Sequence, residues 1–446
     1  MAALRDDTIA ALSTPPGEGA IALLRISGPD ALSIAAKIFT AKSPVSELQP
    51  RKMVFGKIGK AGETVDEGML CIFPAPASAT GENVAEISCH GGILLTRRVL
   101  ELALSAGARH AEAGEFTQRA FLNGKMDLTQ SEAVMDLIQA RSSLALKAAA
   151  NQLQGNLGRH TMEVRGLLLN ALAHLEAFID FPEEGIAPDD FEALQKRFLE
   201  VIEAIDALLA TADEGRILRE GVKLVICGAP NTGKSSLLNL LLGHERAIVS
   251  EQPGTTRDTI EESLTLRGIP FLITDTAGIR ETKDSIEQEG IRRTRQSLEQ
   301  ADLALHVFDA TAWQNDAPPF HPQEILVINK IDLISSANVY PETALRISCK
   351  TGEGLDLLVE EICRRVGGGR LLQGPSSVAI NARHQACLKK ARAALDAGLK
   401  ELKKSSPPEL VAIELHAAND ALGEIVGAAD TEEILGRIFS TFCIGK

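Results

Sequence analysis

The sequence predicts a multidomain α/β and α protein, in which a doubly wound α/β domain interrupts a helical bundle and an α+β domain precedes both. Strand-like and helical patterns alternate from residue 216 to about 372, as a doubly wound sheet requires. Apolar residues recur at helical spacing on both sides of that stretch, as in the helices of a bundle. Short strand-like runs separated by Gly and Pro fill the first part of the chain.

Four segments follow from these patterns. We expect an α+β domain over residues 1–122, a first helical half over 123–215, the α/β domain over 216–372 and a second helical half over 373–446. Expected strands of the first domain are Ala20–Ser27, Met53–Ile58, Gly68–Phe73 and Val84–Ser88, before a helix at Ile93–Leu104. Expected strands of the α/β domain are Leu224–Cys227, Ile269–Thr274, Leu303–Phe308, Ile325–Ile328 and Leu345–Ile347. Helical spacing runs through 133–153, 167–179, 191–208, 388–402 and 415–425, and Phe442–Lys446 is expected to form an exposed tail.

The composition excludes several classes of protein. No apolar run reaches the roughly 18 residues of a membrane helix, and acidic residues next to the single Arg at the N-terminus argue against a signal peptide. Seven scattered cysteines without a C-x-x-C pair indicate neither a zinc site nor a disulfide framework, and favour a reduced, cytoplasmic protein. The net charge of −14 disfavours RNA binding that depends mainly on neutralising phosphates.

The stretch from Lys223 to Ser236 reads KLVICGAPNTGKSS and predicts a phosphate-binding loop. Gly228 and Gly233 allow backbone conformations that a Cβ would block, so loop amides and the following helix N-terminus can face phosphates. Lys234 would place its charge on the β- and γ-phosphates, and the Ser235 hydroxyl would ligate Mg²⁺. We set a chance match aside because three further motifs follow in the expected order.

Two of these motifs suit the γ-phosphate and Mg²⁺. The first is GTTRD at 254–258, in which Thr256 is the candidate to reach both the metal and the γ-phosphate in the triphosphate state. The second is DTAG at 275–278, where Asp275 would hold Mg²⁺ through water and the Gly278 amide would face the γ-phosphate.

The third motif, NKID at 329–332, selects the base. The Asp332 carboxylate accepts from the N1–H and exocyclic amine of guanine, and adenine would leave this acceptor unpaired. Ser348, Cys349 and Lys350 would support the base from behind. Four motifs in this order indicate a GTPase domain.

The water-positioning residue differs from that of Ras-like proteins. Ile279 occupies the position of their glutamine, and an apolar side chain cannot orient water. The following segment offers several carboxylates instead, and its chemistry alone does not choose among them: Glu281, Asp284, Glu287 and Glu289.

Three further residues have two interpretations each. Asn231, inside the phosphate loop, either caps the loop or helps to hold a monovalent cation beside the phosphates. Arg25 and Glu86 interrupt apolar strands, and their pattern favours solvent-facing residues or a structural ion pair over a ligand site.

The motifs together resemble the MnmE (TrmE) family of tRNA-modification GTPases over about Thr8–Lys446. GAPNTGKSS, GTTRD, DTAGIR, NKID and SCK lie between two helical halves. PPGEGAIALLRISG, GENVAEISCHGG, GEFTQRAFLNGKMDLTQSEA and the terminal FCIGK are more specific still.

The resemblance implies a Ras-like P-loop GTPase domain and a set of GTP-binding residues. These would be Asn231, Thr232, Gly233, Lys234, Ser235, Ser236, Ser250, Glu251, Gln252, Pro253, Gly254, Thr255, Thr256, Asp275, Thr276, Ala277, Gly278, Asn329, Lys330, Asp332, Ser348, Cys349 and Lys350. Mg²⁺ would bind Ser235 and Thr256, and activating K⁺ would bind Asn231, Ser250, Gln252 and Thr255. Glu287 matches the family's catalytic, water-positioning glutamate.

The resemblance also implies partners and chemistry. The N-terminal domain would resemble folate-dependent aminomethyltransferases, form the homodimer and bind a 5-formyl or methylene tetrahydrofolate through Arg25, Glu86, Lys125 and Lys446. With the flavin-dependent partner MnmG (GidA), the enzyme would add aminomethyl or carboxymethylaminomethyl groups at C5 of the tRNA wobble uridine. GTP hydrolysis would drive the conformational change. Cys443 matches the family's C-terminal cysteine, and we expect a buried or structural thiol.

Two other functions fit parts of the sequence. A ribosome-assembly switch would be expected to carry its own RNA-binding domain, and no basic segment with a GXXG loop is present. A folate-responsive dimer scaffold would share the folate and GTP sites but would not modify uridine.

Overall fold

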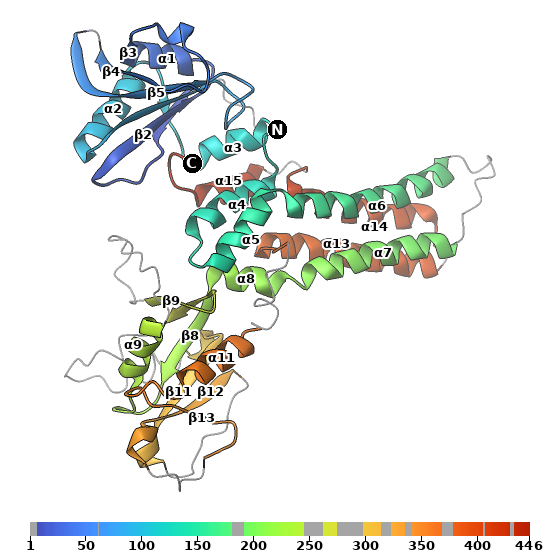
Figure 1. Ribbon diagram of the computed structural model, residues 1–446. Helices are drawn as coiled ribbons and strands as arrows, with labels where there is room; N and C mark the ends of the chain where they lie inside the picture. Colours follow the sequence, from blue (N-terminus) through green and yellow to red (C-terminus); the bar gives the residue numbers. More distant parts are fainter. Residues whose placement is uncertain are drawn as a thin grey trace. The chain divides into compact units, whose positions relative to one another are not determined.

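The computed structural model describes residues 7–60, 62–180, 191–244, 262–273, 298–313, 323–334, 340–367, 378–404, 406–428 and 432–446 (Figure 1). The chain divides into two compact units. The first draws on residues within 1–135, 158–184 and 400–446, and the second on residues within 136–157 and 185–399.

A seven-stranded sheet forms the N-terminal part of the first unit. Its strands are β1 (Ile9–Leu12), β2 (Gly19–Ser27), β3 (Phe39–Ala41), β4 (Val54–Lys60), β5 (Glu63–Phe73), β6 (Val84–Gly91) and β7 (Arg109–His110). They lie in the order β3-β4-β5-β6-β2-β1-β7, with every neighbouring pair antiparallel except β1 and β7. The four strands expected from the sequence are confirmed as parts of β2, β4, β5 and β6, except that β4 begins at Val54 rather than Met53.

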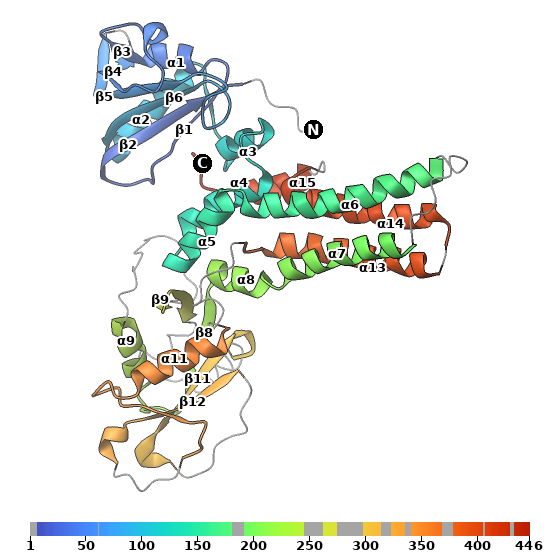
Figure 2. The ribbon, with the colours of Figure 1, turned by 45° about the vertical axis from the view of Figure 1, so that its right-hand side comes forward.

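Two helices cover one face of this sheet, as Figures 1 and 2 both show. They are α1 (Ala31–Ile38) and α2 (Ile93–Ser105), and the second confirms the expected helix. Ile34, Ile38 and Val99 pack with the alternate strand residues that point to this face, such as Ala10 and Ile26. Strand neighbours point to opposite faces, so Ile9 and Ala11 belong to a separate small core on the other side.

That second core includes helix α3 (Glu115–Leu122) and lies beside the end of the chain. Phe116 of α3 is buried with Ile9 and Ala11. The Phe116 N–H donates to the Lys446 main-chain oxygen at 3.2 Å, and the Ser13 hydroxyl donates to the Gly445 oxygen at 3.0 Å.

The expectation of an exposed tail at 442–446 is therefore wrong for most of its length. Phe442 is 6% exposed and packs with Leu128, Met135 and Phe439. Ile444 forms a β-bridge with Ala113. The hydrogen bonds to Ser13 and Phe116 and the packing of Phe442 on Leu128 join residues far apart in the sequence. The composition of the last five residues does not reveal such contacts. Cys443 is exposed, so the expectation of a buried thiol is also wrong.

The helical segment after α3 begins with α4 (Leu128–Gln139), α5 (Ser143–Leu153) and α6 (Asn156–Asp180). The single helical stripe expected at 133–153 is thus two helices. The break has a local cause, because the Ser142 hydroxyl accepts from the Ala145 N–H and caps the start of α5.

The remaining long helices form antiparallel pairs. In the first unit, α14 (Pro408–Val426) lies beside α6 (Figures 1 and 2), and Arg165 Nε of α6 donates to Asn419 Oδ1 of α14 at 2.9 Å. In the second unit, Arg392 of α13 (Ala382–Lys403) pairs with Asp206 of α7 (Phe191–Leu209) at 3.0 Å. The two helical stripes expected over 388–402 and 415–425 lie on the separate helices α13 and α14, and α15 (Glu432–Ser440) precedes the C-terminal residues.

A six-stranded sheet forms the α/β part of the second unit. Its strands are β8 (Val222–Cys227), β9 (Glu262–Leu266), β10 (Ile269–Ile273), β11 (Leu303–Asp309), β12 (Glu324–Asn329) and β13 (Leu345–Arg346). The order is β13-β12-β11-β8-β10-β9, and only the edge strand β9 runs antiparallel. This is the expected doubly wound arrangement, in which ligands bind beyond the carboxyl ends of the strands where the order reverses. Here that point is the end of β8.

The core of this sheet extends to the helices before it. Helices α9 (Lys234–His244) and α11 (Leu355–Arg365) pack on the strands, as do α5 and α8 (Ala212–Glu220). Among the described residues of the chain, no helix is long and apolar enough to cross a membrane.

Candidate functional site

The phosphate loop joins β8 to α9, and two glycines are required by its geometry. Gly228 has φ +143°, and a Cβ there would lie 2.2 Å from the Val307 oxygen of β11. Gly233 has φ +97°, and its Cβ would lie 2.2 Å from Asn329 Nδ2 of β12. Both positions combine a left-handed backbone with a close approach, so any other residue would displace the loop.

Two side chains of the loop, Thr232 and Lys234, donate hydrogen bonds to the loop's own backbone. Thr232 is buried, and its hydroxyl donates to the Ala229 oxygen at 3.0 Å. The Lys234 ammonium donates to the same oxygen at 2.9 Å. Burial lowers the pKa of Lys234. The Lys234 ammonium therefore lies over the loop, where it can exchange this carbonyl for a phosphate oxygen.

The base-recognition loop is joined to the phosphate loop through Asn329. This side chain is 2% exposed, and its Nδ2 donates to the Thr232 main-chain oxygen at 2.8 Å. Its Oδ1 accepts from the Cys349 N–H at 3.1 Å. One buried amide thus holds together three of the motifs found in the sequence.

Asp332 is oriented by the third loop. The Ser348 hydroxyl, fully buried, donates to Asp332 Oδ1 at 2.7 Å and accepts from the Thr351 N–H at 3.2 Å. The Asp332 residue itself is exposed, as a carboxylate that accepts from a base must be before the base binds. Burial raises the pKa of the neighbouring Cys349 thiol to about 11, so it stays neutral.

Lys330 makes two contacts at this end of the sheet. Its ammonium donates to the Asn231 main-chain oxygen at 2.7 Å and pairs with Asp309 Oδ2 at 2.7 Å. Sequence reasoning missed Asp309, although an acidic residue at the carboxyl end of a predicted parallel strand was a signal that could have found it.

The structure thus brings the first and last nucleotide motifs together: Asn231–Ser236, Asn329, Lys330, Asp332 and Ser348–Lys350. Ser235, Ser236 and Lys350 are exposed. The other expected nucleotide and cation residues lie outside the described residues: Ser250, Glu251, Gln252, Pro253, Gly254, Thr255, Thr256, Asp275, Thr276, Ala277 and Gly278. So do the carboxylates considered for water positioning, Glu281, Asp284, Glu287 and Glu289.

Arg25 and Glu86 form an ion pair on the face of the N-terminal sheet that α1 and α2 do not cover. They lie directly opposite each other on β2 and β6, and Arg25 Nε donates to Glu86 Oε1 at 2.8 Å. Each side chain is about one-fifth exposed, at 22% and 21%. The Arg25 guanidinium carbon also lies 5.7 Å from the centre of the Phe116 ring. The ion pair expected from the strand pattern is present, and its remaining exposure leaves both groups accessible to a ligand.

The two other expected folate residues reach this region differently. Lys446 is adjacent, since its main-chain oxygen accepts from the Phe116 N–H. The Lys125 ammonium donates to the Pro76 oxygen at 3.2 Å, and its methylenes lie beside Gly81. The Lys125 side chain therefore contacts the loop between β5 and β6.

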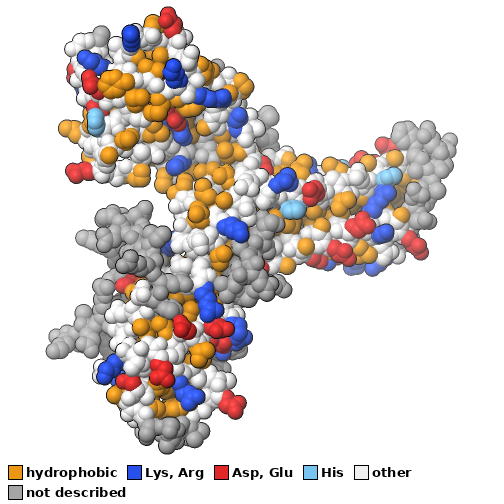
Figure 3. Space-filling model, viewed as in Figure 1, with side chains coloured by type: hydrophobic (Ala, Val, Ile, Leu, Met, Phe, Trp, Pro, Cys, Tyr) orange, Lys and Arg blue, Asp and Glu red, His pale blue; other side chains and the backbone are white. Residues whose placement is uncertain are grey.

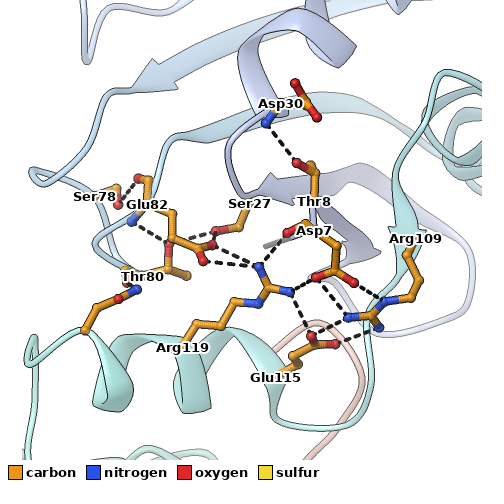
Figure 4. A network of polar contacts seen from close by, with 11 residues as sticks. Asp7, Thr8, Ser27, Asp30, Ser78, Thr80, Glu82, Arg109, Glu115 and Arg119 are labelled. Atoms are coloured by element: carbon orange, nitrogen blue, oxygen red, sulfur yellow. Dashed lines mark hydrogen bonds and ion pairs between the residues drawn. The ribbon is translucent and has the colours of Figure 1, made fainter. Parts of the chain in front are cut away.

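A partly buried network of charges joins this loop to α3 and to Asp7, which precedes β1 (Figure 4). Arg119, 4% exposed, pairs with Glu82 at 3.1 Å, Asp7 at 2.6 Å and Glu115 at 3.0 Å. Arg109 pairs with the same two carboxylates, Asp7 at 2.7 Å and Glu115 at 2.6 Å. Asn123 Nδ2 donates to the Thr80 oxygen at 2.8 Å, next to Glu82. These bonds hold α3 and Asn123, which precede Lys125 in the chain, against the loop between β5 and β6.

A parallel sheet with a glycine-bounded loop before a helix, and an Asn-Lys-x-Asp loop at a neighbouring strand end, defines a P-loop GTPase. Two family models match the chain, one described as the MnmE helical domain over residues 128–443 and the other as the GTP-binding protein TrmE N-terminus over residues 8–125. The chain therefore belongs to the MnmE family of tRNA-modification GTPases. It is a GTP hydrolase that acts in tRNA modification.

Similar proteins cover the whole chain. The tRNA modification GTPase MnmE of Akkermansia muciniphila is 49% identical, over 98% of this chain and 99% of that protein. The proteins of the same name from Moorella thermoacetica and Aquifex aeolicus are both 46% identical, over 99% of this chain and 100% of their own length. A solved structure of the G domain of the T. maritima FeoB iron transporter is 27% identical, covering 32% of this chain and 98% of that chain. Its TM-score of 0.23 is too low to carry a structural argument.

Proposed function

We propose that this GTPase is activated by K⁺ and that, with a flavoprotein partner, it adds an aminomethyl or carboxymethylaminomethyl group to the wobble uridine of tRNA. The observation that carries the GTP site is the Asn329 side chain, which joins the phosphate loop to the base-recognition loop. GTP would bind along this junction, with its phosphates at Lys234 and its base at Asp332. Hydrolysis of GTP leaves uridine unchanged, so its free energy drives motion of the GTPase domain.

Two cations fit the loop chemistry. Mg²⁺ would bind the Ser235 hydroxyl in the first turn of α9, with Thr256 as a second ligand, and would neutralise charge on the phosphates. K⁺ would bind Asn231, with Ser250, Gln252 and Thr255. Asn231 is exposed and has a left-handed backbone, φ 64°, so its side chain is available beside the phosphates while its main-chain oxygen is held by Lys330. Glu287 would position the attacking water.

A tetrahydrofolate derivative would bind beside Arg25 and Glu86 on the N-terminal sheet and would supply the one-carbon unit. Arg25 offers donors, Glu86 offers an acceptor, and the Phe116 ring beside them offers a flat apolar surface. A pterin carries both kinds of hydrogen-bonding group on a flat ring. Lys125 and Lys446 would attract the carboxylates of the folate tail.

The same domain would form a homodimer. Three large apolar side chains are exposed near the start of β2 and of α2: Ile21 at 69%, Ile93 at 63% and Leu94 at 81%. A hollow of about 520 Å³ lies between the β1–β2 loop and α2, and Figure 3 shows hydrophobic side chains gathered on the viewed face of this domain. An exposed apolar patch beside a hollow favours a protein partner. The flavoprotein MnmG would contribute much of the tRNA contact, in keeping with the net charge of −14.

The first test is GTP turnover in potassium and in sodium buffer of equal ionic strength, for the wild type and Glu287→Ala. Faster turnover in potassium, lost in the variant while GTP still binds, supports the cation site and the role of Glu287 together. Equal turnover in both salts would contradict the cation site.

The second test measures uridine modification in a mixture of the protein, the flavoprotein, tRNA, GTP and methylene-tetrahydrofolate. Glu86→Gln is expected to abolish modification and weaken binding of 5-formyl-tetrahydrofolate while GTP turnover persists. Its control is Glu101→Gln, an exposed carboxylate on α2. Folate binding without any uridine modification would instead favour a folate-responsive scaffold.

A further inference from the structure

Asp309 is the last residue of β11 and lies directly opposite Asn329, the last residue of β12. Its carboxylate therefore sits beside the base-recognition loop, at the carboxyl edge where the phosphate loop also begins. Both of its oxygens have partners. Oδ2 pairs with the Lys330 ammonium at 2.7 Å, and Oδ1 accepts from the Thr311 N–H at 2.9 Å and the Thr311 hydroxyl at 2.7 Å.

The Thr311 contacts fix the direction of this carboxylate. The segment Ala310–Ala312 forms a single turn of 3₁₀ helix, and Asp309 caps it. Because the turn holds Oδ1, the Asp309 side chain is kept in one rotamer, and its Oδ2 points toward Lys330. Asp309 is also the more buried partner, with 17% of its side chain exposed against 31% for Lys330.

Lys330 connects Asp309 to the phosphate loop. Its backbone is left-handed, with φ 67°, which sends the side chain back across the loop ends. The ammonium then donates to the Asn231 main-chain oxygen at 2.7 Å. The backbone of Asn231 is itself left-handed. This hydrogen bond therefore holds a loop residue in a backbone conformation that residues other than glycine adopt rarely.

Without Asp309, the Lys330 ammonium would keep the hydrogen bond to the Asn231 main-chain oxygen but lose its ion pair. A lysine side chain has several rotatable bonds and a strongly hydrated ammonium, and a single hydrogen bond to a carbonyl does not confine it. A carboxylate at 2.7 Å adds a charge-assisted hydrogen bond of the stronger kind. The pair therefore determines whether Lys330 stays across the nucleotide site or extends into solvent.

We propose that Asp309 is a positioning residue for guanine nucleotides, which holds Lys330 against the phosphate loop at Asn231 and thereby slows release of the bound nucleotide. This inference rests on the proposed placement of the nucleotide at these loops. Asp309 does not touch the nucleotide in this arrangement, and acts on it through Lys330.

The experiment measures release of a fluorescent N-methylanthraniloyl-GDP from the full-length protein with Mg²⁺, chased by excess GDP. Asp309→Asn keeps an oxygen for the Thr311 hydrogen bonds but removes the charge, and we expect release to be about tenfold faster. Asp309→Glu keeps the charge and should release GDP more slowly than Asp309→Asn. The matched control is Asp302→Asn, an ion-paired aspartate of similar exposure just before the amino end of β11, with release within about twofold of the wild type.

A double-mutant cycle separates positioning from a general structural effect. In a Lys330→Met background, Asp309→Asn is expected to change the release rate by less than about twofold, because the residue through which it acts is gone. A wild-type release rate for Asp309→Asn would overturn the inference, and so would the same acceleration with and without Lys330. If Lys330→Met alone releases GDP at the wild-type rate, the proposed placement of the nucleotide fails instead.

Discussion

The Asn329 amide nitrogen lies 2.8 Å from the main-chain oxygen of Thr232, so the end of β12 is hydrogen-bonded to the middle of the phosphate loop. Asn329 is 2% exposed and also accepts from the Cys349 N–H. A buried amide that satisfies two other loops cannot move without leaving polar groups unpaired, which costs about 1–3 kcal/mol for each group. The base-recognition loop and the phosphate loop are therefore held together by one buried side chain.

Gly233→Ala is expected to break the hydrogen bond between Asn329 and the phosphate loop. The added Cβ would lie 2.2 Å from Asn329 Nδ2, and the position has φ +97°. Strain and loss of the Asn329 hydrogen bond together should cost about 3 kcal/mol, which is roughly a hundredfold in GTP affinity. Isothermal titration with a non-hydrolysable GTP analogue measures this loss.

Gly243→Ala is the matched control for that experiment. Gly243 lies in α9, has nothing within 4 Å of its added Cβ and has an ordinary helical backbone. Alanine should stabilise the helix slightly and leave the affinity unchanged. Equal affinities for Gly233→Ala and the wild type would show that the loop is more adaptable than its contacts imply.

Asp332→Asn should change which base the site prefers. An asparagine can accept from the N1–H of xanthine and donate to its O2, whereas guanine presents a second donor that the amide nitrogen repels. We expect about tenfold weaker GTP binding and improved XTP binding. Competition of GTP and XTP for the same site checks this outcome.

Ser348→Ala tests the support of Asp332 separately. Removing the hydroxyl that donates to Asp332 Oδ1 at 2.7 Å should weaken GTP without favouring XTP, because the carboxylate remains but is less well oriented. A gain in XTP affinity in this variant would contradict the supporting role of Ser348.

The parallel sheet was predictable from the sequence because each of its inner strands is a short apolar run, and three of these runs, in β8, β10 and β12, lead into a nucleotide motif. All five expected strands of the α/β part overlap observed ones. Thr274, at the end of one of them, lies outside the described residues. The antiparallel edge strand β9, Glu262–Leu266, mixes polar and apolar residues and was not expected. Short strands such as β3 and β7 have two or three residues, too few for any periodicity.

Long-range side-chain pairs were not predictable from one sequence. Arg25 and Glu86 are 61 residues apart, and only the register of β2 against β6 decides that they face each other. Asp7 and Arg119 are 112 residues apart, and although Arg119 lies in the GEFTQRAF motif, nothing in that motif points to Asp7 as its partner. Pattern analysis identifies which residues are unusual in a strand, and the strand register determines their partners.

Acidification should loosen the charge network around Arg119. Burial by itself would raise the pKa of Glu115, but hydrogen bonds from Arg109, the Glu112 N–H and Arg119 outweigh it and lower that pKa. The hydrogen bond from Arg109, with Arg119, lowers the pKa of Asp7 against burial. Carboxyl groups with lowered pKa values stabilise the fold above their unfolded values and lose this contribution as pH falls through the folded ones. The loss should begin below about pH 4.5, the ordinary value for Glu.

Hydrogen exchange of β1 and α3 amides at pH 7 and below pH 4 measures this loss after correction for intrinsic rates. Glu115→Gln should already be destabilised at pH 7, by about 3 kcal/mol, and should lose less on acidification than the wild type. Glu101→Gln, at an exposed pair with Arg97, should behave as the wild type at both pH values. An undiminished pH response in Glu115→Gln would assign the titration to other carboxylates.

The end of the chain should contribute to stability through one side chain. Phe442 is 6% exposed and its ring lies 5.4 Å from that of Phe439, so Phe442→Ala leaves a cavity and should cost about 3–5 kcal/mol in the free energy of unfolding of the tail region. Ile444→Ala is the control, because Ile444 is 54% exposed and its β-bridge to Ala113 is made by the backbone. Carboxypeptidase digestion followed by mass measurement distinguishes them, with rapid loss of the last residues expected only for Phe442→Ala. If both variants resist digestion equally, the hydrogen bonds of Gly445 and Lys446 to Ser13 and Phe116 suffice to hold the tail, and Phe442 is not its anchor.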